Sequence, residues 1–281
     1  MWQMLLRNYL MGQAQQKMRE AAGQAMQQPA GVEPGSAEPK KPEVCHVGLV
    51  FALSTESGCF VDKLAGLIKT EGAGFVAREG GLAGRRMIVI ESGAGRENAA
   101  RATQALIDGH HPQWIISAGF AGGLDERLKQ NDILMADSLV DAEGHTLALD
   151  LKMPPAPRLH VGRLLTVDRV IADPAEKLAL GEKHAALAVD METMAVAEVC
   201  ARENVRLLCI RVIIDEVGRK LPHDIDVLVK KKSTAGMLGA AAGAIIRRPG
   251  SIKDMWQLKE DALTASERLA KFLVEIAGQL P

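Results

Sequence analysis

The sequence predicts an α/β protein: a single three-layer α/β/α domain around a mixed, mostly parallel, twisted sheet. Short apolar runs bounded by polar residues or glycines alternate along the chain with segments of helical periodicity, which is the order of elements in α/β folds. The runs lack the alternation of a strand with one wet face, so we expect strands that are covered on both faces. Alternating strands and helices imply right-handed crossover connections and a largely parallel or mixed sheet.

The composition is that of a globular protein able to bury a sizeable core. Of the 281 residues, 47% are hydrophobic and 25% are charged, as in ordinary folded domains. The net charge of -1 gives no support for nucleic acid as a partner. No histidine or cysteine spacing typical of a metal site is present, so we expect no metal site. The cysteines form no CxxC pair and are predicted as thiols of a reducing, cytoplasmic compartment: Cys45, Cys59, Cys200 and Cys209.

Residues 1–43 are predicted to lie outside the folded catalytic domain, which we place at residues 44–281. Residues 1–28 are rich in Met, Gln and Ala, with apolar residues clustered near the start. Their apolar run is too short to span a bilayer, and they lack the pattern of a signal peptide. We interpret them as an amphipathic helix that lies on a membrane surface or on a partner, with a frayed tail as the alternative. Residues 29–43 form a proline-rich linker.

The first half of the domain contains three predicted buried strands. They cover Val44–Leu53, Arg86–Glu91 and Gln113–Ala118. The pattern predicts a helix over Ser57–Lys69 after the first strand, and a helix over Glu97–Asp108 after the second.

Glycine-rich turns follow the second and third strands. Gly93-Ala94-Gly95 lacks the third glycine of a dinucleotide fingerprint, so it is weak support for a nicotinamide site. A tight turn that faces its backbone amides toward a ligand or an anion explains it better. The third strand ends in Gly119-Phe120-Ala121-Gly122-Gly123. Ligands of open α/β sheets bind at the carboxyl ends of strands, so we expect a binding loop here, with a flexible turn as the alternative.

Further strands and helices complete the domain. A glycine- and alanine-rich stretch over Gly236–Ile246 is too short to span a bilayer and suits close helix packing, or less well a basic membrane contact. An apolar stripe from Met255 to Ile276 predicts an amphipathic helix that packs on the sheet or on another subunit. The other expected elements are strands over Asp132–Val140, Thr146–Leu151, Arg163–Ile171 and Val205–Asp215, and a helix from Pro174.

The most informative stretch is Ala188–Val199, where a short apolar entry meets two acids at the start of a predicted helix. Asp190 stands where an N-cap would sit, and Glu192 falls in the first turn. The acids therefore either cap the helix and complement its dipole, or accept hydrogen bonds from a polyol such as ribose.

Arg211 and Asp215 lie in the last predicted strand. An arginine inside an apolar run is costly unless it is paired with an acid. Arg211 is thus either half of a structural ion pair or a group that orients a catalytic acid. Asp215 closes the strand and is expected at the mouth of the site.

Three motifs occur in order on this chain: AGFAGGL over Ala118–Leu124, VDMETMA over Val189–Ala195, and RVIID over Arg211–Asp215. Together they make residues 44–217 resemble the nucleoside phosphorylase and nucleosidase superfamily, the group that includes methylthioadenosine/S-adenosylhomocysteine nucleosidase. The segment Ala244–Leu258 looks more like the hopanoid-associated phosphorylase branch, whose members cleave adenine from an adenosylated lipid precursor.

The resemblance implies cleavage of an N-glycosidic bond without a cofactor. It implies that Asp215 is the general acid that protonates the leaving purine, and that burial raises its pKa. Relatives are dimers or larger, so it also implies a homo-oligomer. The remaining implied roles are ribose binding by Glu192, Met191 and Asp190, water activation by Glu56, an acid network with Arg211, and a base or nucleophile loop of Phe120, Ala121, Gly122, Gly123, Val170 and Ile171.

Four departures from the family pattern bear on the nucleophile and the base. Phe120 replaces a small hydroxyl residue, and the early phosphate-binding arginine turn is absent, which favours water over phosphate. Val170 replaces a purine-stacking aromatic residue, and Ile214 replaces a serine that assists the acid. We therefore expect a purine nucleosidase that acts on a 5′-substituted adenosine. The alternatives are a phosphorylase, including one with a lipid-linked adenosine substrate, and a non-catalytic nucleoside-binding module.

Overall fold

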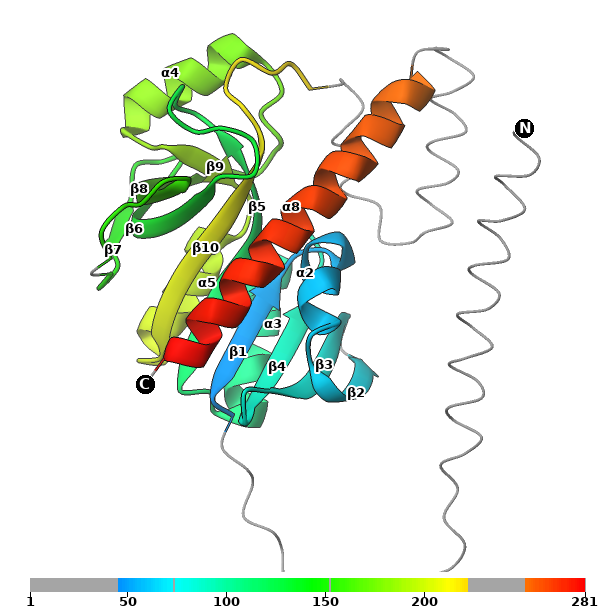
Figure 1. The fold of residues 1–281 in the computed structure, drawn as a ribbon. Coiled ribbons are helices and arrows are strands. Elements are labelled where there is room, and N and C mark those ends of the chain that lie inside the picture. Colours follow the sequence, from blue (N-terminus) through cyan, green and yellow to red (C-terminus); the bar gives the residue numbers. More distant parts are fainter. Residues whose placement is uncertain (1–44, 73, 152, 222–250, 281) are drawn as a thin grey trace, which may run out of the picture. The chain divides into compact units, whose positions relative to one another are not determined.

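The computed structural model describes residues 45–72, 74–151, 153–221 and 251–280. Residues 1–43 and the stretch Gly236–Ile246 therefore lie outside the described residues, and the predictions on them stay predictions. Figure 1 shows the described elements in chain order. They are β1 (Val47–Phe51), α2 (Ser54–Val61), β2 (Ala65–Gly72), β3 (Phe75–Leu82), β4 (Arg85–Glu91), α3 (Arg96–His110), β5 (Trp114–Gly123), β6 (Ile133–Asp141), β7 (Thr146–Ala148), β8 (Leu159–Thr166), α4 (Pro174–His184), β9 (Ala188–Asp190), α5 (Thr193–Arg202), β10 (Arg206–Asp215) and α8 (Ser251–Gln279).

The strands form one mixed sheet, so the predicted α/β class is confirmed. β1 pairs in parallel with β4 and β5, and β5 pairs in parallel with β10. β2 and β3 extend one side of the sheet as antiparallel strands. At the other side the sheet closes on itself, because β10 pairs with both β5 and β6. The closed circuit runs β5–β9–β8–β6–β10, which the sequence did not predict.

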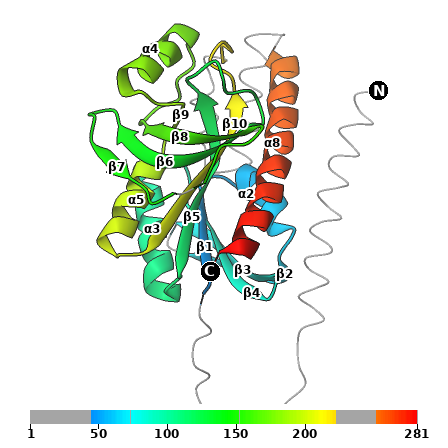
Figure 2. The same cartoon turned by 60° about the vertical axis from the view of Figure 1, so that its left-hand side comes forward.

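Helices cover both faces of the central strands, as Figures 1 and 2 show. Side chains alternate along β1, and this alternation defines the layers. Val47, Leu49 and Phe51 belong to the core cluster that also contains residues of α2 and α8. Val50 points to the opposite side, into the cluster formed with α3 and α5. These two layers around the sheet are the predicted α/β/α arrangement.

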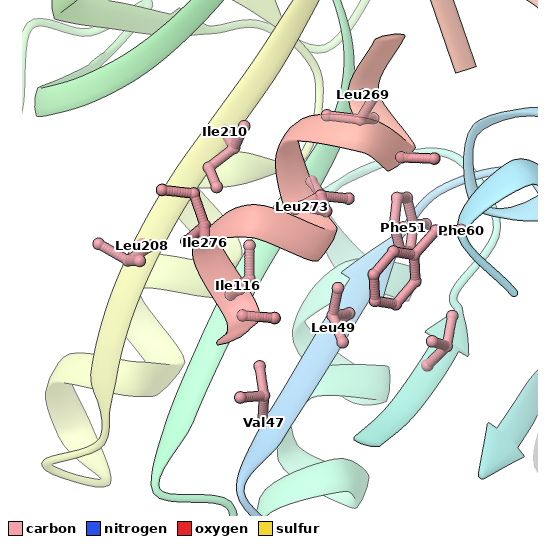
Figure 3. Packing of buried hydrophobic residues seen from close by; sticks show 14 of the residues in the cluster. Val47, Leu49, Phe51, Phe60, Ile116, Leu208, Ile210, Leu269, Leu273 and Ile276 are labelled. Carbon is pink, nitrogen blue, oxygen red and sulfur yellow. The ribbon is translucent and has the colours of Figure 1, made fainter. Parts of the chain in front are cut away.

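Helix α8 supplies the largest part of one layer. Leu269, Leu273 and Ile276 lie on the face of α8 that meets β1, β5 and β10 (Figure 3). Leu273 is fully buried, whereas Leu263 on the same helix is 57% exposed. The apolar stripe of the sequence is therefore confirmed as a packing face on the sheet.

The helix predicted over Ser57–Lys69 is wrong in its length. α2 ends at Val61, and the chain continues as β2, which is exposed along its whole length. An exposed strand shows no buried alternation, so its sequence gives no periodic signal. β3 and β4 are joined by Ala83 and Gly84, whose φ values of 50° and 75° are the left-handed pair of a tight hairpin turn.

Two other predicted boundaries also change. The glycine-rich segment after the third strand is not a loop, because β5 continues through Gly123 and pairs there with β9. The strand predicted over Arg163–Ile171 lies earlier and ends at Thr166.

Among the described residues, no helix is long and apolar enough to span a membrane. The four cysteines, all within this part of the chain, are free thiols.

We predict that Leu273→Ala lowers the free energy of unfolding by about 2–5 kcal/mol, because it leaves a cavity beneath α8. Urea denaturation followed by circular dichroism measures the loss. Leu263→Ala is the matched control and changes stability by less than about 0.5 kcal/mol. Equal losses in the two variants would contradict this account of the core.

Candidate active site

The described part of the chain encloses a cavity of about 190 Å³ at the carboxyl ends of the central strands. The ends of β5 and β10, the β9–α5 junction and the segment after β8 line it. A second, polar space of about 10 Å³ adjoins it and shares Glu56, Phe120 and Glu192 with it. That volume is close to the lower limit for a single water molecule. The lining of the small space also includes Ser92, Ser117 and Arg211.

Glu56 reaches this region from the first turn of α2. Its Oε2 accepts hydrogen bonds from the backbone N–H of Ala52 (3.0 Å) and Leu53 (2.8 Å), and its Oε1 accepts one from Phe120 (2.9 Å). These three amides fix the carboxylate in place. Burial raises the pKa of Glu56, and the amides and the charge of Arg211 oppose the rise.

Gly119 makes the position of Glu56 sterically possible. A Cβ at residue 119 would lie 2.7 Å from Glu56 Oε1, which is closer than real Cβ contacts come. The sequence predicted that something approaches the backbone closely at this glycine segment. In the structure, the approaching group at residue 119 is the carboxylate of Glu56.

Asp190 and Arg211 form a buried ion pair. Arg211 Nη2 lies 2.8 Å and Nε 3.1 Å from Asp190 Oδ2, and the two side chains are 3% and 1% exposed. Asp190 Oδ1 accepts a hydrogen bond from Thr166 Oγ1 (2.8 Å), and Oδ2 also accepts the N–H and the hydroxyl of Thr193. Arg211 Nη2 donates to Ser117 Oγ as well (2.8 Å).

This network corrects the expectation that Asp190 is the N-cap residue, and it bears on the predicted contact of Asp190 with ribose. The residue ends β9 and is not the N-cap residue, a position that Glu192 occupies. Both oxygens of Asp190 are already bonded to groups of the protein, so its carboxylate is committed to Arg211 and the start of α5. Of the two acids in the motif, Glu192 is therefore the better candidate for ribose hydroxyls.

Glu192 faces the cavity from the start of α5 and makes no capping hydrogen bond. Its Oε1 accepts the backbone N–H of Gly95 at 2.8 Å. The predicted turn Gly93–Gly95 therefore does present an amide to an anion, and that anion is a side chain of the protein. Burial raises the pKa of Glu192 to about 8, and the negative charges of Asp190 and Glu56 add to the rise.

Asp215 closes β10 and is 4% exposed. The ammonium group of Lys177, from α4, is bonded to Asp215 Oδ2, and the Lys177 side chain is fully buried. Burial raises the pKa of Asp215, while the charges of Lys177 and Arg219 oppose the rise.

Sequence analysis missed Lys177 because a lysine in an amphipathic helix normally faces solvent. A weak signal was available. Lys177 is in helical phase with Gly181, which packs on Leu124, and with the buried His184.

The predicted base or nucleophile loop lies partly at the cavity. Phe120, Ala121 and Gly122 line it from β5, and Val170 and Ile171 line it from the segment after β8. Gly123 does not line it, and a Cβ there would instead meet the Asp215 carbonyl oxygen at 3.3 Å and the Ile213 side chain at 3.6 Å. The remaining predicted residues at the cavity are Met191, Glu192, Asp190, Glu56 and Asp215, while Arg211 lines the small space.

One group of side chains in the described ranges has ligand atoms close enough to hold a metal ion. It consists of Asp141, Glu143 and His145, whose ligand atoms lie within 4.8 Å of one another. Asp141 Oδ2 is bonded to His145 Nδ1 at 2.8 Å and lies 4.0 Å from Arg96. These contacts explain the group as an ion-pair cluster, and none of its members lines the cavity.

Fold and site together define an α/β protein with an acid-lined ligand cavity at the carboxyl ends of its strands. A model of the phosphorylase superfamily matches residues 47–247. The chain therefore belongs to the phosphorylase superfamily. The prediction of an enzyme from the nucleosidase and nucleoside phosphorylase group is confirmed at this level.

Individual relatives agree with the family. A 5′-methylthioadenosine/S-adenosylhomocysteine nucleosidase of Shewanella halifaxensis is 28% identical over 212 residues, which cover 66% of this chain and 92% of the relative. The solved structure of such a nucleosidase from S. pneumoniae with a transition-state inhibitor superposes with a TM-score of 0.65 and 20% identity, over 84% of this chain and all of the other. A futalosine hydrolase mutant of Helicobacter pylori gives a TM-score of 0.64 and 18% identity, with the same coverage. The two solved structures establish the likeness of fold.

We predict that Gly119→Ala destabilises the protein by about 1–3 kcal/mol, because the new methyl group forces Glu56 away from the Phe120 N–H. Thermal unfolding followed by circular dichroism measures the effect. Gly58→Ala in α2 is the control, since a Cβ there meets nothing within 4 Å. If both variants unfold at the same temperature, the close approach of Glu56 does not constrain residue 119.

A second prediction concerns pH and Glu192. Its pKa is about 8 in the folded protein against an ordinary value of 4.5, so between these values the folded state holds a proton that the unfolded state has lost. Stability contributed by Glu192 therefore falls as pH rises from about 4.5 to 8. Urea denaturation of wild type and Glu192→Gln at several pH values tests this. Wild type should lose stability relative to the variant across that range, and a constant difference would contradict it.

Proposed function

We propose that this protein hydrolyses the N-glycosidic bond of a purine nucleoside, a 5′-substituted adenosine such as methylthioadenosine or S-adenosylhomocysteine. The observation that carries the proposal is that Glu56, Glu192 and Asp215 line one cavity beside a polar space of about 10 Å³. The names of the curated relatives support the substrate class.

Asp215 is proposed as the general acid. Cleavage sends the electrons of the C1′–N bond into the base, which then needs a proton. The buried carboxyl group of Asp215 has a raised pKa, which favours the protonated form that can donate. Its O–H bond breaks as the N–H bond of the leaving base forms.

Glu192 and Met191 are proposed to hold the ribose. Both line the cavity, and the carboxyl group of Glu192 can accept hydrogen bonds from vicinal hydroxyls and, while it holds a proton, donate one. As the bond breaks, positive charge develops on the sugar, and nearby carboxylates stabilise it. Asp190 and Arg211 act behind this surface as an ion pair that positions the start of α5.

Glu56 is proposed to activate the attacking water. The small space between Glu56, Ser92 and Glu192 is of a size for water, whereas a phosphate ion has five heavy atoms and needs more room. The water oxygen bonds to C1′, and one water proton passes to Glu56. Nucleoside and water thereby give a free base and a free sugar, with protons balanced between Asp215 and Glu56.

Base release from methylthioadenosine and S-adenosylhomocysteine, with and without phosphate, tests the proposal. We expect wild type to release adenine without phosphate, and Asp215→Asn and Glu56→Gln to lose about 10²- to 10⁴-fold in kcat. Asp62→Asn, an exposed acid just after α2, is the control and keeps wild-type activity. Release that requires phosphate, with ribose 1-phosphate as product, would overturn hydrolysis in favour of phosphorolysis.

The wider expectations remain predictions. They are a homo-oligomer, a cytoplasmic location, and contact of residues 1–28 with a membrane surface. Binding of a nucleoside without turnover would instead favour the non-catalytic alternative.

A further inference from the structure

Lys177 is a fully buried cation, and its ammonium group is hydrogen-bonded to Asp215 and to two backbone carbonyl groups just after β10. Its ammonium group is bonded to Asp215 Oδ2, and it donates to the carbonyl oxygens of Glu216 and Arg219, each at 3.2 Å. An ammonium group has three N–H donors, so this geometry uses every one of them. One side chain of α4 therefore fixes both the acid and the chain segment that follows β10.

We propose that Lys177 is a positioning residue that holds the carboxyl group of Asp215 with Oδ1 toward the bound purine. The proposal rests on the function proposed above, in which Asp215 is the general acid. Lys177 occupies Oδ2, and within the described residues no protein group is hydrogen-bonded to Oδ1. Both oxygens of Asp215 lie beside cavity-lining Gly122, since a Cβ on that residue would be 3.3 Å from Oδ1 and 3.4 Å from Oδ2. Because Lys177 holds Oδ2, Oδ1 is the oxygen left to meet a bound base.

The positive charge of Lys177 stabilises the carboxylate that Asp215 becomes when it gives up its proton. A protonated Asp215 gives its Oδ1 proton to the base and becomes a carboxylate in a buried position, which is costly without a cation. Lys177 is in direct contact with the carboxylate that forms and stabilises it. Of the described residues, Arg219 is the other cation that acts on Asp215, and it is itself paired with Asp261 at 2.7 Å. Within this part of the chain, Lys177 is therefore the cation in direct contact with the acid.

Removal of Lys177 has two expected consequences. The carboxyl group loses the contact that selects its orientation, so fewer encounters place Oδ1 at the base. It also loses a cation that favours its charged form, so deprotonation of Asp215 moves to higher pH. Loss of packing alone would produce neither a new orientation nor a new pH dependence.

The test compares Lys177→Met and Lys177→Arg with wild type by adenine release from methylthioadenosine across pH. We expect kcat of Lys177→Met to fall at least 10-fold with KM changed less than 3-fold, and the high-pH limb of kcat to move to higher pH. Lys177→Arg keeps a cation and recovers part of kcat. Lys183→Met, an exposed lysine of the same helix, is the matched control and behaves as wild type.

Three results would overturn the role of Lys177. They are an unchanged kcat in folded Lys177→Met, a lower kcat without movement of the high-pH limb, and no recovery in Lys177→Arg. If Lys177→Met does not fold, Lys177→Gln, which keeps a hydrogen-bond donor without charge, is measured by the same criteria. Asp215→Asn separates the two proposals. Full activity of Asp215→Asn overturns the proposed function. If Asp215→Asn is inactive while Lys177→Met keeps wild-type kinetics, only the role of Lys177 is overturned.

Discussion

The buried pair of Arg211 and Asp190 is the interaction on which the rest of the site depends. A guanidinium group this deep needs a carboxylate in direct contact, and the pair joins β10 to the junction between β9 and α5. Thr166, Thr193 and Ser117 complete the polar contacts of the pair, so β5 and β8 are fixed by the same network. The positions of the cavity-lining groups of these elements follow from it.

The acids of the site are held in two ways. Asp190 and Asp215 are in direct contact with the cations Arg211 and Lys177, whereas Glu56 and Glu192 are held mainly by backbone amides. Burial raises the pKa of both glutamates, and the charges of Asp190 and Glu56 add to the rise at Glu192. In the proposed reaction, the positive charge that develops on the sugar favours the carboxylate forms of these glutamates.

Much of the fold could be predicted from the sequence, because buried strands of a parallel sheet form continuous apolar runs. β2 and β3 could not, since β2 is fully exposed and has no periodic pattern. The sequence indicated that Asp215, Glu192 and Glu56 gather at strand ends, and the structure brings them to one cavity. The sequence did not indicate that Asp190 is bonded to Arg211 or that Lys177 is bonded to Asp215. Both contacts join elements that are far apart in the chain, and local sequence patterns carry no information about such distances.

The closed circuit of strands has a consequence for the order of events during synthesis. β10 completes the circuit by pairing with β5 and β6, whose residues precede it by many tens of positions in the chain. A nascent chain that ends before Arg206 contains Glu56 and Glu192 but neither Arg211 nor the closing strand. The circuit of strands around the cavity therefore cannot close until β10 has been synthesised, and until then Asp190 has no Arg211 to pair with.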